Sequence, residues 1–162
     1  SIAIGKETLI LAVPSCYPIN ESLSDYAIDP LQLCSAPLDI NGIPAVSISR
    51  FAQERFLFLK QGNDVYRRGL KFCRDAGFEP RIVMELDQML TAYYMAEAGH
   101  GITFSRATIP YYTKKSDHLV FYRIDHRETE REIRGYYNIR SNAISKKQQD
   151  FLTYMSKYPL FG

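Results

Sequence analysis

Four residues that could hold a ligand follow the short apolar run 56–59, namely Lys60, Gln61, Gly62 and Asn63. A helix that begins at this point offers unpaired backbone N–H groups and a partial positive charge, and both attract a carboxylate or a phosphate. Gly62 lets a ligand approach the main chain closely, while the amides of Gln61 and Asn63 can orient it. We therefore expect these residues to bind a small anionic molecule.

Two more positions of this kind follow later apolar runs. Asp87 and Gln88 come after the run 80–85, where Asp87 is expected to cap a second helix, and Phe104 ends the run 101–104. Ligands of open α/β sheets collect at the carboxyl ends of the strands, so we expect these three residues to shape the same pocket. Capping and turn formation explain any one of them equally well, and the prediction therefore rests on the group.

The residue types needed for catalysis or metal binding do not form a familiar motif. The histidines lack the HxxxH, HxH and HExxH spacings, and they are His100, His118 and His126. The chain contains no GxSxG, no GxGxxG and no phosphate-binding loop. We therefore expect a binding protein that is not an enzyme, with no catalytic residues, no metal and no cofactor.

The composition is that of an ordinary folded protein. The 162 residues suffice for one core or two small lobes, and the net charge of +2 does not predict nucleic-acid binding. No apolar run approaches the roughly 20 residues of a membrane span, and the first residues lack the plan of a signal peptide. Cys16, Cys34 and Cys73 include no CxxC pair, so we expect reduced thiols in the core of a cytoplasmic protein.

An alternation of strands and helices positions the candidate residues. The runs 56–59, 80–85 and 101–104 are predicted to be strands, and the segments 64–76 and 88–98 between them are predicted to be helices. Strand, helix, strand, helix, strand with short joints is typical of an α/β sheet with parallel crossovers.

The two predicted helices differ in how their apolar residues are distributed. The first has a single apolar face, formed by Val65, Gly69, Phe72, Cys73 and Ala76, which indicates a helix lying on the sheet. The second is apolar nearly all round, so we expect it to be sandwiched between other parts of the protein.

Flanking segments are expected to complete the sheet. The run 8–13 is almost wholly apolar, which predicts a strand covered on both faces. Residues 119–124 and 133–139 are predicted to be strands, separated by a solvated turn in the charged stretch 125–134.

A last helix is predicted from a capping box. Ser145 is followed three residues later by Gln148, a spacing that satisfies two backbone donors at a helix start. We expect Phe151, Leu152 and Met155 of this helix to face inward.

Five stretches of the chain occur in a familiar order. They are ETLILAVP at 7–14 with YPI at 17–19, the strand 51–59, AGFEPRIVME at 76–85, AEAGHGITF at 96–104 and the closing helix with Phe151 and Leu152. Together they resemble the effector-binding (substrate-binding) domain of LysR-type transcriptional regulators over nearly the whole chain. In smaller departures from the family pattern, Tyr17 replaces a common histidine and His100 stands where a hydrophobic residue is frequent.

The resemblance implies a fold and an organisation. The fold would be an α/β lobe like that of type II periplasmic binding proteins, with a mixed, mostly parallel sheet flanked by helices. Residues 1–123 would form the second lobe of the effector-binding domain, and residues 124–162 would be the return strand and helix that normally belong to the first lobe. Most of the first lobe and the helix-turn-helix domain are expected to be missing from this chain.

The resemblance also implies a function. The chain would sense a small-molecule effector, and it would reach operator DNA only through the missing helix-turn-helix domain of a full-length homodimer or tetramer. The residues leave three alternatives open: a solute-binding protein of a transport system, an enzyme of small carboxylic acids on the same scaffold, and a plain interaction module.

Overall fold

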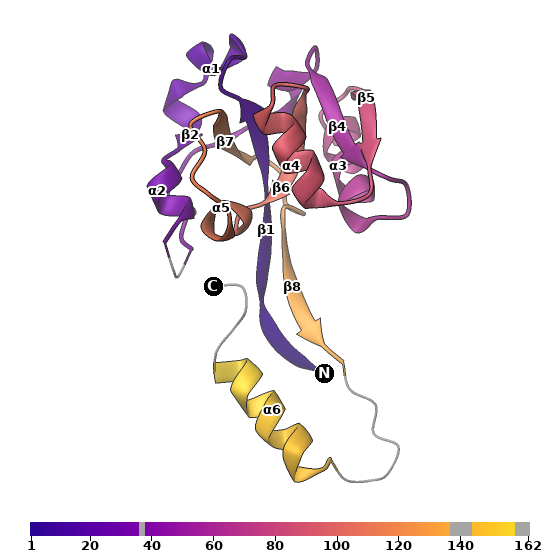
Figure 1. The fold of residues 1–162 in the computed structure, drawn as a ribbon. Helices are drawn as coiled ribbons and strands as arrows, with labels where there is room; N and C mark the ends of the chain where they lie inside the picture. The colour runs from indigo at the N-terminus through magenta and orange to yellow at the C-terminus, as the bar shows by residue number, and fades with distance from the viewer. Residues whose placement is uncertain (36–37, 137–143, 158–162) are drawn as a thin grey trace.

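The structure, a computed structural model, describes residues 1–35, 38–136 and 144–157. A mixed sheet dominates it (Figure 1), and its strands are β1 (Ile2–Pro14), β2 (Ala27–Ile28), β3 (Ala45–Val46), β4 (Arg55–Leu59), β5 (Arg81–Leu86), β6 (Ile102–Arg106), β7 (Leu119–Ile124) and β8 (Glu130–Gly135). The strand order is β2-β7-β1-β6-β4-β5, with β3 paired to β7 and β8 paired to β1.

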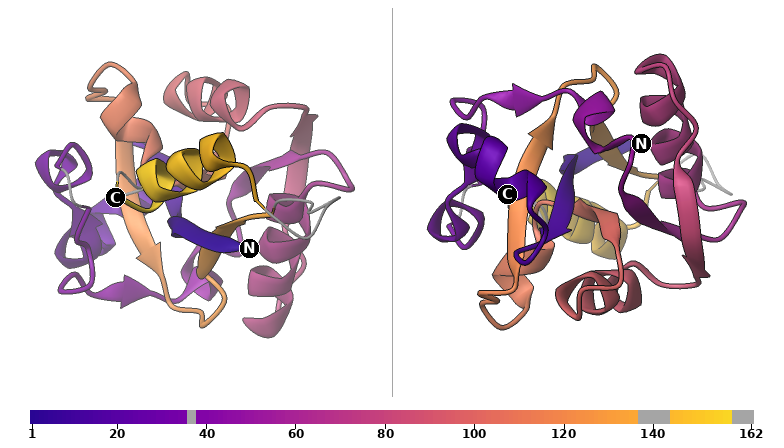
Figure 2. Two further views of the ribbon diagram at one scale, coloured as in Figure 1. Left: turned by 90° about the horizontal axis from the view of Figure 1, so that it is seen from below. Right: turned by 90° about the horizontal axis from the view of Figure 1, so that it is seen from above.

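The helices lie on both sides of this sheet. They are α1 (Ile19–Ser22), α2 (Pro30–Leu33), α3 (Asp64–Asp75), α4 (Met89–Glu97), α5 (Ile109–Tyr112) and α6 (Lys146–Lys157), and short 3-10 turns occur at Ser24–Tyr26 and Ile48–Phe51. Figure 2 shows α3 and α4 on opposite faces of the sheet. Among the described residues, no helix is both long enough and apolar enough to cross a lipid bilayer.

The predicted succession of strands and helices around the candidate residues is confirmed. β4 runs parallel to both β5 and β6, and α3 and α4 form the two crossovers between them. The sheet is mixed, as expected, because β1 runs antiparallel to β6, β7 and β8. The structure therefore has the mixed α/β sheet flanked by helices that the family resemblance implies.

We call the sheet β2-β7-β1-β6-β4-β5 with helices α1 to α5 the lobe. Both faces of β1 are covered within the lobe, as its apolar run predicts. Leu9 and Leu11 pack into the core beneath α3, whereas Ile10 and Ala12 pack into the core beneath α4. All four side chains are fully buried. Since neither face meets water, an alternation of polar and apolar residues would be destabilising in this strand.

The expectation that α4 is sandwiched is wrong for the chain as described. Ala92, Tyr93 and Ala96 face the sheet and are buried, but Leu90 and Tyr94 are 45% and 47% exposed on the opposite side. An apolar pattern on every side of a helix does not reveal what covers its outer side. For α4 the pattern therefore overpredicted burial.

The first part of β1 leaves the lobe and pairs with β8 in a two-stranded ribbon (Figure 1). The ladder shifts register between Ala3 and Gly5, which marks a bulge in β1. The charged stretch 125–134, interpreted as a solvated turn, is therefore a strand from Glu130 onward. A ribbon exposed to solvent needs no apolar residues, so the charge pattern hid the strand. Of the predicted strand 133–139, residues 137–139 lie outside the described part of the chain.

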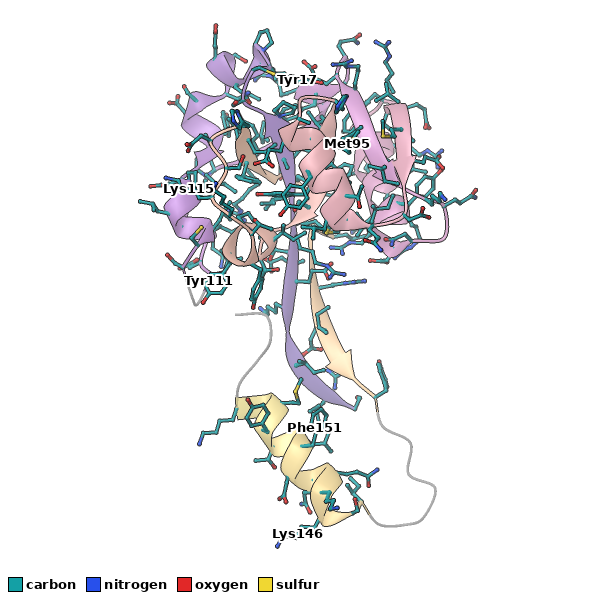
Figure 3. All side chains as sticks on the ribbon, viewed as in Figure 1. Tyr17, Met95, Tyr111, Lys115, Lys146 and Phe151 are labelled. Carbon is teal, nitrogen blue, oxygen red and sulfur yellow. The ribbon has the colours of Figure 1, made fainter. Side chains whose placement is uncertain are left out.

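Helix α6 lies beside this ribbon, away from the lobe, as the labelled Phe151 and Lys146 show (Figure 3). The predicted capping box is confirmed: the Gln148 N–H donates to Ser145 Oγ (3.3 Å), and Gln148 Oε1 accepts from the Ser145 N–H (2.9 Å). Met155 is buried and Leu152 half-buried, but Phe151 is 61% exposed, so the inward orientation predicted for Phe151 is wrong.

The three cysteines are free, but only one of them lies in the core. Cys73 of α3 is buried, whereas Cys16 and Cys34 are exposed. The expectation of three core thiols is therefore wrong for Cys16 and Cys34, because both belong to the irregular segments that follow β1 and α2 on the surface.

Candidate functional site

The carboxyl ends of β4, β5 and β6 meet at one edge of the sheet. Leu59 is paired with Leu86, and Phe56 with Ile102, so the loops that follow β4 and β5 emerge side by side. The Lys60 N–H donates to the carbonyl oxygen of Leu86 at 2.9 Å. The structure thus brings the two predicted loops, 60–63 and 87–88, together.

An ion pair links the two loops. Lys60 Nζ lies 2.8 Å from Asp87 Oδ1, and both side chains are well exposed. The hydrogen bond to Asp87 and its negative charge raise the pKa of Lys60 above its ordinary value. Lys60 therefore carries a full charge at neutral pH, and it contributes a cation at this edge of the sheet.

Asn63 caps α3. Its Oδ1 accepts from the Val65 N–H at 2.8 Å, which satisfies one of the free donors at the helix start. Gly62 has φ of +96°, a backbone conformation that favours glycine, and no atom lies within 4 Å of where its Cβ would stand. The main chain at Gly62 is therefore open to an approaching molecule.

A surface cavity of about 650 Å³ begins at this turn and continues along the outer side of α3. Gln61, Gly62 and Asn63 line it, so three of the predicted residues share one open space. The charged lining residues are Arg67, Lys71, Arg74, Asp64 and Asp75. Lys60, Asp87, Gln88 and Phe104 do not belong to the lining of this cavity.

The start of α4 differs from the prediction. Gln88 is the capping residue by position, but no side chain caps this helix, and Asp87 pairs with Lys60 instead. The prediction that Asp87 caps α4 is therefore wrong. At the start of α4 no side chain accepts a hydrogen bond from the first backbone N–H groups, whereas at α3 the Asn63 side chain does so.

Phe104 lies in the core of the lobe and not at its rim. It is 2% exposed, and its ring packs against the rings of Phe56, Phe58 and Phe72 at centroid distances of 6.1, 5.5 and 5.7 Å. Phe104 lies on β6 toward the end of the sheet where the predicted loops emerge. Its side chain, however, points beneath α3, where it contacts Gly69. Its contribution is to support the helix from below.

The family model for the LysR substrate binding domain matches residues 26–158 of the sequence. This match spans most of the chain. The chain is a LysR substrate binding domain. The expected family resemblance is thereby confirmed, and the family is one of ligand-binding domains in transcription regulators, not of enzymes.

Several solved structures share the fold of this LysR domain. They include the regulatory domain of CcmR from Synechocystis PCC6803 in complex with 2-PG (15% identity, TM-score 0.69, covering 98% of this chain and 66% of that one). The effector binding domain of QuiR in complex with shikimate is similar (13%, 0.61, 98% and 64%), as is HinK from Pseudomonas aeruginosa (12%, 0.61, 94% and 46%).

At these identities the likeness concerns the fold. The LysR domain spans less than two thirds of the length of each of these structures. A search of curated protein sequences finds no match to it.

A group of buried charges beside the candidate loop escaped the sequence analysis. Glu7 of β1 and Arg68 of α3 are 4% and 3% exposed and form an ion pair. Two signals in the sequence could have drawn attention to them: Glu7 stands next to an apolar strand, and Arg68 follows Asp64 by one helical turn. Among the described residues, no cluster of histidine, cysteine and acidic side chains suits a metal ion.

Proposed function

We propose that this LysR domain senses a small anionic effector for a transcription regulator, and that the effector binds at the turn 61–63. The observation that carries the proposal is the open cavity at the start of α3, where Gln61, Gly62 and Asn63 surround an accessible stretch of main chain. In support, CcmR and QuiR, which share the fold, were solved with 2-PG and shikimate bound.

The charges around the cavity favour an anion. Three cations, Arg67, Lys71 and Arg74, line it against two carboxylates, Asp64 and Asp75, and Glu79 outside the lining pairs with Arg74 at 2.7 Å. The partial positive charge at the start of a 12-residue helix adds to the positive charge of the lining. A negatively charged guest is therefore attracted to the start of α3.

The proposed contacts divide into direct and framing ones. Backbone N–H groups around Gly62 and the side-chain amides of Gln61 and Asn63 would hold the anion. Lys60, Asp87 and Gln88 would frame it from the neighbouring loop, since the ion pair between Lys60 and Asp87 fixes the spacing of the two loops.

The energy required is within reach of such contacts. Moving a regulator from mostly inactive to mostly active takes roughly 5 kcal/mol of differential affinity. Hydrogen bonds to charged groups contribute about 1.5–3 kcal/mol each, so two or three that form in one state only would suffice.

We also propose how the domain acts within a full-length regulator. The full-length protein would be a homodimer or tetramer in the cytoplasm, and a helix-turn-helix domain outside this chain would contact operator DNA. Effector binding would then change how the domains are arranged and how strongly the DNA is held.

The test is a calorimetric titration of small carboxylates and phosphate esters, shikimate among them, into the wild type and variants. Gln61→Ala and Asn63→Ala should each weaken binding about tenfold, the equivalent of one lost hydrogen bond of about 1.4 kcal/mol. Gln53→Ala is the matched control, because Gln53 is exposed and precedes β4 at the opposite edge. Equal affinity in Gln61→Ala, Asn63→Ala and the wild type would remove this turn from the binding site.

A further inference from the structure

A group of charged residues lies beside the candidate turn, where β1 and β8 leave the lobe. At its centre Glu7 Oε1 and Arg68 Nη1 lie 3.1 Å apart, and both side chains are only 4% exposed. Removing two charges from water is costly, and a pair at this depth is favourable only when further hydrogen bonds satisfy its remaining atoms. The surroundings of Arg68 meet this condition.

The guanidinium group of Arg68 has partners on every side. Nη1 donates to Glu7 and also contacts Asp64 Oδ2 at 3.4 Å. Nη2 donates to the carbonyl oxygens of Glu128 and Thr129, both at 2.8 Å, and Nε donates to Glu128 at 3.2 Å. A single side chain of α3 therefore joins β1 and the turn that leads into β8.

Two more arginines complete the group. Arg131 of β8 pairs with Glu7 Oε2 at 3.1 Å and with Asp64 Oδ2 at 2.5 Å. Nε of Arg106 lies 2.9 Å from Glu7 Oε2, although the Nε atoms of both Arg106 and Arg131 are buried without a hydrogen bond. Three guanidinium groups thus surround two carboxylates, so the loss of either carboxylate leaves the buried Arg68 with one fewer negatively charged partner.

Backbone hydrogen bonds at the same level define the base of the ribbon. The Leu9 N–H donates to Thr129 O at 2.9 Å, the oxygen that Arg68 also contacts. The Ala107 N–H donates to Thr8 O at 2.9 Å and ties β1 to the end of β6. The charged group and these bonds hold the same short stretch of β1.

We propose that Glu7, Asp64, Arg68 and Arg131 form a lock that fastens the base of the β1–β8 ribbon to α3. The lock makes the ribbon and the lobe move as one body. It also reaches the candidate turn, because Asp64 directly follows Asn63 and pairs with Arg131 of β8. That last link, by which a displaced turn 61–63 would pull on the ribbon, rests on the proposed function, whereas the lock does not.

Hydrogen exchange of the 162-residue chain without ligand tests the lock. Arg68→Met should accelerate exchange of the Leu9 amide and of the ribbon amides in 2–8 and 130–135 by about tenfold or more, relative to amides of β4. Asp64→Asn, at a side chain 31% exposed, should accelerate the same amides by about threefold even if Arg68→Met fails to fold. Asp87→Asn removes an exposed ion pair from the same edge, and it should leave ribbon exchange unchanged.

Two results would overturn the proposal. One is ribbon exchange in Asp64→Asn that equals exchange in Asp87→Asn. The other is equal acceleration of the ribbon and of β4, which would mean that the charges stabilise the core alone. Because no ligand is present, failure of the lock is distinguishable from failure of the effector titration.

Discussion

Replacing Gly69 by alanine sets two opposite effects against each other at the contact between α3 and the sheet. In the interior of a helix, alanine is favoured over glycine by about 1 kcal/mol. A Cβ at this position, however, would lie 2.7 and 2.8 Å from Cε2 and Cδ2 of Phe104 and 3.1 Å from Cε1 of Phe58. The balance depends on whether the ring of Phe104 can retreat.

The structure indicates that it cannot. The ring of Phe104 is enclosed by Phe56, Phe58 and Phe72, of which Phe56 and Phe72 are fully buried. Overpacking a filled core costs about 1–3 kcal/mol, and two contacts below 3.0 Å put Gly69→Ala in the upper half of that range. After subtraction of the helix preference, we expect a net loss of about 1–2 kcal/mol in the free energy of unfolding.

Urea denaturation followed by circular dichroism measures this loss, and thermal unfolding should show a midpoint lower by roughly 2–8 °C. In the double variant Gly69→Ala/Phe104→Leu the smaller side chain makes room for the methyl group, so the two changes should couple favourably by at least about 0.5 kcal/mol. A Gly69→Ala variant more stable than the wild type would refute the reasoning, since the helix preference would then outweigh the contact with Phe104.

Four further predictions concern other parts of the chain. Burial raises the pKa of the Cys73 thiol to about 12 from 9.0, so folded protein should be labelled by maleimide at Cys16 and Cys34 only, with Cys73 reacting after unfolding, as mass spectrometry can show. The pKa of the Cys73 thiol is higher in the folded protein than in the unfolded one, so the thiol's contribution to stability is complete below pH 9 and is lost as the pH rises toward 12. The free energy of unfolding of Cys73→Ala should therefore decline less steeply over that interval than that of the wild type, as urea titrations can measure. Gly62→Ala should lower stability by about 1 kcal/mol in the same assay because its φ is +96°, whereas Gly42→Ala, with no positive φ and no near neighbour, should change it little. Met155→Ala should cost about 2 kcal/mol and speed amide exchange in α6, whereas Phe151→Ala should change either by little; equal effects would contradict the burial of Met155 and the exposure of Phe151.

The parallel part of the fold could be predicted because each element there carries a complete local signal. Asn63 stands at a helix start, Gly77 at its end, and the apolar positions of α3 recur with helical spacing. The β1–β8 ribbon carried no such signal, since its side chains meet solvent and the pattern of Glu130–Gly135 is one of charges. The spacing of apolar residues indicates which side chains are buried, and few side chains of the ribbon are buried.

The candidate site was predictable in position but less so in detail. Parallel pairing guarantees that the residues after β4 and β5 meet, and Lys60 and Asp87 indeed do. Whether a side chain such as Phe104 turns to the rim or to the core depends on its neighbours across the sheet, which the sequence does not order in space. Glu7 and Arg68 are 61 positions apart, so only the folded chain reveals them as partners.

The bulge near Ile4 decides where β1 can tolerate a change of length. From Leu9 to Val13 successive side chains alternate between two buried core clusters, so one inserted or deleted residue would place each side chain in the opposite core. The bulge already accommodates an unpaired residue, so variation before it shifts the ribbon alone. Related chains should accordingly vary in length ahead of Gly5 and hold the spacing from Glu7 to Pro14 constant.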